Sequence, residues 1–252
     1  MTGGGNRSLG GKLAALRTNV EVFGLAHTAR AVLAHAHLVS GPTPDRFDRR
    51  YGVSTGGEVE VADSDLPGPH RAHAVKYQAT HERVMEHVLA HLPVRPETTS
   101  FVDVGCGKGK AVLMAAMRPF AFVLGVELSP AYCAIARRNL ARFPAEARRC
   151  EDVEILCADA TAFPLPAGDT VYYLFNPFEA PVLEPLLERI RTTAEAATRT
   201  AVATGTPAPR VLVAFCNPRV GTELLDRMGF RCLRETVVIS PDWNWSLWEW
   251  PG

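Results

Sequence analysis

A glycine-rich turn between an apolar strand and a helix constrains the fold of this chain more than any other feature. Residues 101–104 are Phe-Val-Asp-Val, with an acid at Asp103, and glycines follow at Gly105, Gly107 and Gly109. Glycine lets the backbone turn tightly and lets a ligand approach it closely, while the next helix directs its N-terminal N–H groups at that ligand. Dinucleotide-binding and nucleotide-binding folds share turns of this kind. The turn therefore predicts an α/β sheet with a ligand at the end of its first strand.

Apolar runs alternate with helical patterns through the rest of the chain. We expect strands near residues 100–105, 120–127, 152–157, 169–175, 210–215, 231–239 and 245–250. A helical pattern follows each of the first five, and Ser129-Pro130 has the N-cap and first-turn proline of a helix start. No long helix separates the last two strands, so they should pair antiparallel. The pattern predicts an open, doubly wound sheet, which binds ligands at the carboxyl ends of its parallel strands.

The N-terminal part of the chain departs from this alternation. Residues 13–40 carry apolar side chains at helical spacing, residues 58–61 indicate a short strand, and residues 76–92 indicate a helix. We therefore divide the chain into an N-terminal helical cap, residues 1–92, which we expect to form the substrate region, and an α/β core, residues 93–252. Because amphipathic helices need a partner surface, we expect the cap to fold over the carboxyl ends of the strands.

Charge and composition exclude several classes of partner. The chain of 252 residues has a formal net charge of zero, so no field over the whole protein attracts nucleic acid or an acidic membrane. Its six cysteines include no Cys-x-x-Cys pair, and its first residues lack the apolar segment of a signal peptide. No apolar run reaches membrane-spanning length. We expect a cytoplasmic protein, and the arginine-rich, lysine-poor composition is typical of a GC-rich bacterial genome.

The histidines cluster in the N-terminal part of the chain, between His27 and His91. None of them has metal-ligand spacing with acidic partners, so we predict no metal site. A histidine in the loop before the core, His70 or His73, is a candidate for a general base on the substrate side.

Acids and an Asn-Pro-Phe sequence follow the later strands. Glu127 ends the second strand, Asp159 follows the third, and Asn176-Pro177-Phe178 follows the fourth. With the glycine-rich turn, this ordered set resembles the class I S-adenosylmethionine (SAM)-dependent methyltransferases, from about Tyr77 to the C-terminus. The resemblance implies SAM as cofactor, S-adenosylhomocysteine (SAH) as product, and a seven-stranded Rossmann-like sheet of order 3-2-1-4-5-7-6 whose last strand is antiparallel.

The resemblance and the residue chemistry together give a set of cofactor-binding candidates. Glu127 can accept hydrogen bonds from both ribose hydroxyls, although it could instead be the N-terminal charge of the next helix. The family's acid at Asp159 accepts from the adenine amino group, and an Asp-initiated turn is the alternative. Asp103 would anchor the turn or bind the SAM ammonium group through water, and Leu128 or Phe163 would sandwich the adenine. The full set is Tyr77, Thr80, Asp103, Gly105, Cys106, Gly107, Gly109, Glu127, Leu128, Asp159, Ala160 and Asn176.

Tyr77 and Thr80 are placed in the first turn of the helix before the first strand, which closes over SAM in the resembling family. Tyr77 would contact the cofactor through its ring or its hydroxyl group.

The Asn-Pro-Phe sequence is the candidate catalytic site. It resembles the Asn/Asp-Pro-Pro-Tyr/Phe motif of methyltransferases that act on planar nitrogens, in which Asn accepts from the substrate amino group and the ring stacks. The second proline is missing here, which argues against a flat amide or base as substrate, and bacterial methyltransferases with Tyr/Phe-Asn-Pro-Phe match more closely. Asn176, Pro177 and Phe178 would line the acceptor site; the alternative is a rigid turn in which Asn176 caps the next helix.

We expect the protein to transfer a methyl group from SAM to a nucleophile, in particular a nitrogen of a small molecule. A protein or peptide N-methyltransferase and a non-catalytic SAM-binding protein are the alternatives. No nucleic-acid, membrane or metal partner is expected. Four tryptophans near the C-terminus fit a half-buried sheet edge or the seam of a homodimer; they are Trp243, Trp245, Trp248 and Trp250.

Overall fold

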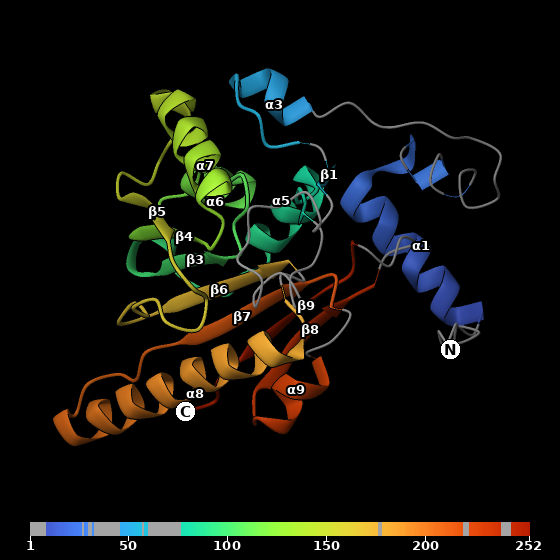
Figure 1. The fold of residues 1–252 in the computed structure, drawn as a ribbon. Helices are drawn as coiled ribbons and strands as arrows, with labels where there is room; N and C mark the ends of the chain where they lie inside the picture. Colours follow the sequence, from blue (N-terminus) through green and yellow to red (C-terminus); the bar gives the residue numbers. More distant parts are fainter. Residues whose placement is uncertain are drawn as a thin grey trace.

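The computed structural model describes residues 9–26, 28–29, 32, 46–56, 58–59, 77–175, 178–218, 222–237 and 243–252. A seven-stranded sheet carries helices on both of its faces (Figure 1). A separate two-stranded sheet joins two N-terminal segments.

The strands of the large sheet run β5-β4-β3-β6-β7-β9-β8. Neighbouring strands among β3 to β7 are parallel, whereas β9 is antiparallel to both β7 and β8. The predicted strands, the order 3-2-1-4-5-7-6 and the antiparallel last strand are therefore confirmed. The bounds are β3 (Ser100–Val104), β4 (Phe122–Glu127), β5 (Val153–Cys157), β6 (Thr170–Phe175), β7 (Val211–Cys216), β8 (Arg231–Thr236) and β9 (Trp245–Glu249).

Helices cover the two faces of the sheet in an ordered way. Those described are α1 (Leu9–Phe23), α3 (Arg46–Tyr51), α5 (Glu82–Ala90), α6 (Lys110–Ala116), α7 (Pro130–Arg142), α8 (Ala180–Thr204) and α9 (Thr222–Arg227). In Figure 1, α5, α6 and α7 lie on one face, and α8 and α9 lie on the other. Helix α7 begins as predicted, because the Ser129 hydroxyl accepts a hydrogen bond from the Tyr132 N–H at 3.1 Å and Pro130 occupies the first helical position.

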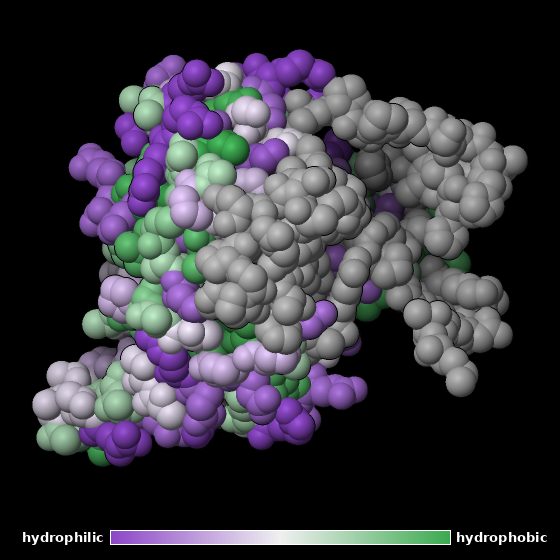
Figure 2. Space-filling model, viewed as in Figure 1, coloured by the Kyte–Doolittle hydropathy of each residue, from purple (hydrophilic) through white to green (hydrophobic). Residues whose placement is uncertain are grey.

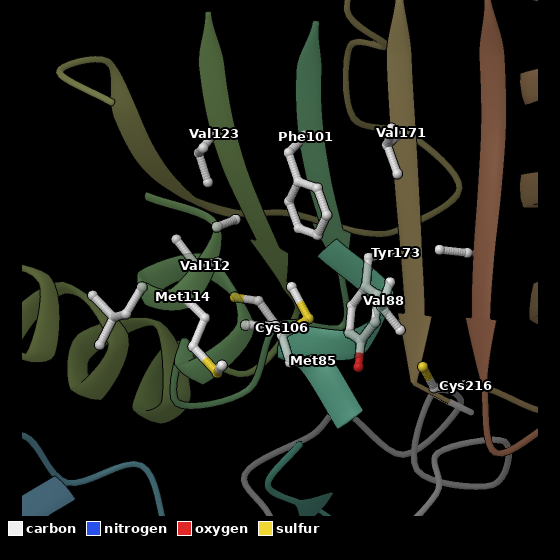
Figure 3. Close-up of a cluster of buried hydrophobic side chains, with 14 of the residues drawn as sticks. Met85, Val88, Phe101, Cys106, Val112, Met114, Val123, Val171, Tyr173 and Cys216 are labelled. Carbon is white, nitrogen blue, oxygen red and sulfur yellow. The ribbon is translucent and has the colours of Figure 1, made fainter. Parts of the chain in front are cut away.

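The two faces have separate hydrophobic cores, because successive residues of a strand point to opposite sides. On one face, Phe101 and Tyr173 pack with Met85 and Val88 of α5 and with residues of α6 (Figure 3). The other face packs against α8 and α9 through the alternate strand residues, which include Val102, Val104, Tyr172, Leu174 and Val213. Burial on both faces explains why the parallel strands read as nearly continuous apolar runs.

The segment before the first core strand differs from the prediction of one helix over residues 76–92. Tyr77–Gln78 form strand β2, which pairs antiparallel with β1 (Glu58–Val59). Helix α5 starts only at Glu82, and the His81 ring accepts a hydrogen bond from the Arg83 N–H at 3.2 Å. Placing Tyr77 and Thr80 in the first turn of that helix was therefore wrong. Pairing with β1, a distant segment, extends the backbone at Tyr77, and the amphipathic pattern alone does not reveal such pairing.

Two of the tryptophans lie in the interior of the large sheet. Trp245 and Trp248 are on β9, which is flanked by β7 and β8, and both side chains are buried. The expected edge position was wrong for these two residues, because the C-terminal hairpin places β8, not β9, at the border of the sheet.

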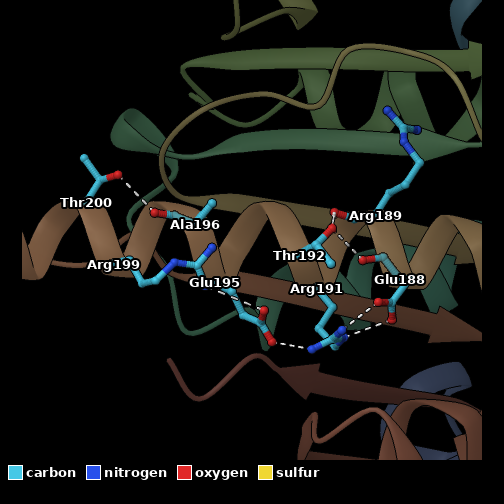
Figure 4. Close-up of polar contacts among 8 residues, drawn as sticks. All are labelled: Glu188, Arg189, Arg191, Thr192, Glu195, Ala196, Arg199 and Thr200. Carbon is cyan, nitrogen blue, oxygen red and sulfur yellow. Dashed lines mark hydrogen bonds and ion pairs between the residues drawn. The ribbon is translucent and has the colours of Figure 1, made fainter.

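The solvent-facing sides of the helices are charged. Helix α7 exposes Arg137, Arg138 and Arg142, and its outer surface is strongly hydrophilic in Figure 2. On α8, Arg191 pairs with Glu188, at 2.6 Å, and with Glu195 (Figure 4). Pairs three and four residues apart along a helix lie on the same face and stabilise it by roughly 0.2–0.5 kcal/mol each.

Candidate active site

The turn between β3 and α6 needs glycine at three positions. Gly105, Gly107 and Gly109 have φ angles of 81°, 52° and 86°, in the left-handed region that residues with a Cβ rarely adopt. The N–H groups of Gly105 and Cys106 both donate to the carbonyl of Val126 in β4, at 2.8 and 2.9 Å. The turn is thus bound to the end of the neighbouring strand.

The absence of a side chain at two of these glycines also admits close neighbours. A Cβ on Gly107 would lie 2.3 Å from Cε2 of Tyr77, and one on Gly109 would lie 3.2 Å from Cβ of Ala136 in α7. The Tyr77 ring therefore packs directly on the glycine-rich turn. The predicted contact of Tyr77 with the cofactor stays a prediction, and the wrong helix assignment does not overturn it.

Glu127, the last residue of β4, connects the glycine-rich turn with the start of α7. One carboxylate oxygen accepts from the Gly107 N–H and the other from the Ser129 N–H, both at 2.8 Å. The side chain is 9% exposed. Both interpretations of Glu127 therefore have support, since it contacts the start of α7 and also stands at the turn. Because a carboxylate oxygen can accept more than one hydrogen bond, these contacts are compatible with ribose binding.

Asp103 is a buried carboxyl group beside Glu127. It is 4% exposed, and burial, followed by the nearby charge of Glu127, raises its pKa to about 8. Within the described part of the chain, its side chain accepts no hydrogen bond. A buried carboxylate that lacks a cationic partner is a place where a ligand's ammonium group can bind. The site therefore fits SAM, whose amino-acid part carries such a group.

The side chain of Cys106, in the same turn, shows no sign of a role in ligand binding. It is buried, its thiol is 3.9 Å from the Gly107 carbonyl, and burial raises its pKa well above the ordinary value. The thiol is therefore a poor nucleophile.

The end of β5 carries the Asp-initiated turn that was the alternative for Asp159. One carboxylate oxygen of Asp159 accepts from both the N–H and the hydroxyl group of Thr161, each at 2.7 Å. Ala160 is buried, whereas Leu128 is half-buried. Phe163 is 1% exposed and packs in the core beneath the sheet, so Leu128 is the more accessible of the two adenine candidates.

Tyr77 and Thr80 use their hydroxyl groups within the protein. Tyr77 donates to the carbonyl of Thr55 at 2.6 Å, and burial raises its pKa well above the ordinary value. Thr80 and the hydroxyl of Tyr173 lie 3.1 Å apart, and both side chains are buried. The Tyr77 hydroxyl is therefore engaged, and its ring is the part next to the turn.

The candidate catalytic sequence is only partly visible. Asn176 and Pro177 lie outside the described residues, whereas Phe178 is half-buried and packs against the core on the α8 face. Helix α8 begins after Glu179, which occupies the N-cap position that one interpretation gave to Asn176.

An aromatic pair stands at the end of β6, immediately before this sequence. The rings of Phe175 and Trp243 are 5.8 Å apart and almost parallel, at 7°, and both residues are half-buried. The His81 ring meets Trp243 edge-on at 5.2 Å. Sequence reasoning missed this grouping, because Trp243 precedes β9 and lies far from Phe175 in the chain.

Residues 46–56 belong to the expected cap, but none of them was among the predicted site residues. The carboxylate of Asp48 accepts from the N–H groups of Thr55 and Gly56, both at 2.8 Å. Lys108, within the glycine-rich turn, donates from Nζ to the carbonyl of Gly56 at 2.8 Å. The spacing from Asp48 to the Ser-Thr-Gly-Gly run is the one local signal that could have indicated a capped turn.

Comparison with known proteins agrees with this geometry. Residues 101–196, from β3 into α8, match the family model described as a methyltransferase domain. No curated protein sequence matches the chain. In the part of the chain that the structure describes, no helix is long and apolar enough to cross a membrane.

Three similar solved structures are methyltransferases. A TehB-like SAM-dependent methyltransferase from Corynebacterium glutamicum is 14% identical, with coverage of 66% of this chain and 86% of that chain and a TM-score of 0.42. Magnesium protoporphyrin IX methyltransferase from Synechocystis, with bound SAM, is 16% identical, with coverage of 66% and 74% and a TM-score of 0.39. The glycopeptide N-methyltransferase MtfA, complexed with SAM, is 14% identical, with coverage of 73% and 98% and a TM-score of 0.43.

The matched domain, the strand order and the two carboxylates at the glycine-rich turn agree with one another. Residues 101–196 therefore carry a methyltransferase domain, and such a domain implies SAM as its cofactor.

Proposed function

We propose that this protein methylates a nitrogen of a small organic molecule. SAM supplies a methyl group that is already activated by its sulfonium sulfur. The protein must therefore hold the acceptor in line with that group, and such orientation contributes roughly 7–11 kcal/mol toward lowering the barrier. The acceptor nitrogen has to arrive with a free lone pair, and an amine can lose its proton to water before it binds.

The chain's residues at the strand ends support distinct roles in cofactor binding. Glu127, fixed by the Gly107 and Ser129 N–H groups, is the proposed partner of the ribose hydroxyls. Asp103 is the proposed partner of the ammonium group, and Asp159 that of the adenine amino group. Leu128 and the backbone at Ala160 are the proposed adenine contacts.

The stacked pair of Phe175 and Trp243 is the observation that carries the acceptor proposal. In the sequence, Phe175 directly precedes Asn176, and an asparagine side-chain oxygen is suited to accept a hydrogen bond from an N–H group. Half-buried aromatic faces favour an organic acceptor, and neither residue offers the positive charge that phosphate groups require. We also propose a cytoplasmic location, because all six cysteines are free thiols.

A turnover screen tests the proposal. The full chain is incubated with SAM and with panels of small amines, phenols, carboxylic acids and amine-bearing peptides, and SAH release is measured. We expect SAH release with small amines, and loss of that activity in Asn176→Ala.

Each other outcome contradicts the proposal in a defined way. Turnover restricted to phenols or carboxylic acids would exclude nitrogen as the acceptor atom. Turnover restricted to peptides would identify a protein or peptide N-methyltransferase. SAH binding without turnover in any panel would favour a non-catalytic SAM-binding protein.

A further inference from the structure

Residues 46–56, which we call the N-terminal strap, contact the glycine-rich turn although about 50 residues separate them in sequence. Three consecutive carbonyl groups of the strap each accept a hydrogen bond from a different side chain at the turn. Ser54 accepts from Asn139 at 3.1 Å, Thr55 from Tyr77 at 2.6 Å, and Gly56 from Lys108 at 2.8 Å. The three carbonyl groups of the strap thus each have a side-chain donor, and the donors come from α7, β2 and the glycine-rich turn.

Asn139 connects the strap, the turn and α7. Its side-chain oxygen accepts from the Ser54 N–H at 3.0 Å, and its amide nitrogen donates to the carbonyls of Ser54 and Lys108 at 3.1 and 2.9 Å. The residue is 2% exposed. Asparagine is a poor helix former, and one that is buried inside a helix with only main-chain partners serves a tertiary role.

The strap itself is held in shape by Asp48 and anchored by α3. Asp48 accepts the N–H groups of Thr55 and Gly56, which orients the carbonyls of this turn. Phe47 is 1% exposed, and its ring stacks with that of Phe143 after α7 at 6.1 Å. The strap is therefore a preformed surface against the turn.

These contacts surround Gly107. On one side, the Tyr77 ring packs so closely that a Cβ on Gly107 would lie 2.3 Å from it. On the other side, the Gly107 N–H donates to Glu127 at 2.8 Å. Lys108, the next residue, is bound through its carbonyl to Asn139 and through Nζ to Gly56. The strap thus holds two neighbours of Gly107, the Tyr77 side chain and Lys108, and so restricts the backbone that carries the Gly107–Glu127 hydrogen bond.

We propose that the strap preorganises the cofactor site and that Asn139 is a positioning residue for SAM. A turn already fixed in the binding conformation loses less conformational freedom when the ligand binds, so affinity increases. The inference rests on the proposed ribose role of Glu127.

The test measures SAH binding to the full chain by calorimetry, below the melting temperature of every variant. Asn139→Ala removes all three contacts of the side chain, and we expect SAH affinity to fall about tenfold to a hundredfold. Asn139→Asp keeps an acceptor for the Ser54 N–H but removes both donors, so it should not restore affinity. Lys108→Met removes the hydrogen bond to Gly56 and the contact of Nζ with the Tyr77 ring, 4.8 Å from its centroid, but keeps the main-chain contact with Asn139. Lys108 is partly exposed, so this variant should fold and bind SAH about threefold to tenfold more weakly.

Two control variants separate positioning from general loss of stability. Arg138→Ala changes the exposed neighbour of Asn139 on α7 and should leave SAH affinity unchanged. Leu225→Ala creates a cavity in α9, on the opposite face of the sheet, and should lower the melting temperature without weakening SAH binding. An equal loss of affinity in Leu225→Ala would overturn the inference.

A double-mutant cycle with Glu127→Ala gives a readout that a purely structural role would not change. If Asn139 acts through the Gly107–Glu127 contact, Asn139→Ala should cost less affinity in the Glu127→Ala background than in the natural chain. Additive losses would overturn the proposal. If the natural chain fails to bind SAH, the cofactor assignment fails; if it binds while Asn139→Ala and Lys108→Met bind equally well, only the strap inference fails.

Discussion

Asp103 holds a carboxyl group inside the sheet, where burial and then the charge of Glu127 raise its pKa to about 8. The sequence predicted its position, because the acid interrupts an apolar strand two residues before the first glycine. The raised pKa depends on burial and on the Glu127 carboxylate, which only the folded chain brings together.

SAH affinity should increase with pH up to about pH 8. A bound ammonium group favours the ionised carboxylate, so below that pKa binding must also remove the proton from Asp103, and affinity should rise by up to about tenfold per pH unit. Above about pH 8 the ligand's own amino group loses its charge. Calorimetry between about pH 6 and 9 measures this profile. Asp103→Asn should abolish the rise below pH 8, and a flat profile in the natural chain would contradict the assignment.

The same pKa shift predicts how the stability of the cofactor-free protein depends on pH. The folded state keeps the Asp103 proton at pH values where the unfolded chain, with an ordinary pKa near 4, has lost it. This group therefore lowers stability as pH rises from about 4 through about 8. The melting temperature of Asp103→Asn minus that of the natural chain should therefore be higher at pH 9 than at pH 5. A constant difference between the two proteins would show that the carboxyl group is not perturbed.

Glu127→Ala should weaken SAH binding about tenfold to a hundredfold, because hydrogen bonds to a charged acceptor contribute roughly 1.5–3 kcal/mol. Glu127→Gln retains one acceptor oxygen and should lose less affinity. Calorimetry on both variants makes this comparison, and undiminished binding in Glu127→Ala would rule out the ribose role.

At the scale of elements, the packing of the glycine-rich turn depends on Tyr77, which lies outside the strand, turn and helix that form the motif. Gly107 is required both by its positive φ and by the Tyr77 ring, whereas Gly168 has a similarly positive φ of 85° and open space where a Cβ would lie, with nothing within 4 Å. The two glycines therefore separate backbone strain from steric overlap.

Gly107→Ala should destabilise the protein more than Gly168→Ala. Backbone strain costs each variant roughly 1–2 kcal/mol, and overlap with Tyr77 should add about 1–3 kcal/mol in Gly107→Ala alone. Urea unfolding of both variants measures the difference. Combining Gly107→Ala with Tyr77→Ala should recover the added part, so equal costs for the two glycines would contradict the close packing described above.

At the scale of the whole molecule, the N-terminal segments share a core with the sheet. Phe47 of α3 and Met85 and Val88 of α5 belong to the same buried cluster as Phe101 of β3. We expect a single cooperative unfolding transition, with far-ultraviolet circular dichroism and tryptophan fluorescence changing together. A separate, earlier transition would favour an independent cap, and the boundary at residue 92 stays a prediction until this is measured.

The sequence by itself determined the strands, the glycine-rich turn and the acids that follow the strands. Apolar periodicity and the conformational freedom of Gly105, Gly107 and Gly109 are local properties that each segment carries with it. Tertiary structure decided the conformation of Tyr77, the position of Trp243 against Phe175, and the attachment of the strap through Asn139. These features depend on hydrogen bonds and ring contacts between segments far apart in the chain, and such contacts leave no periodic pattern in the sequence of either segment.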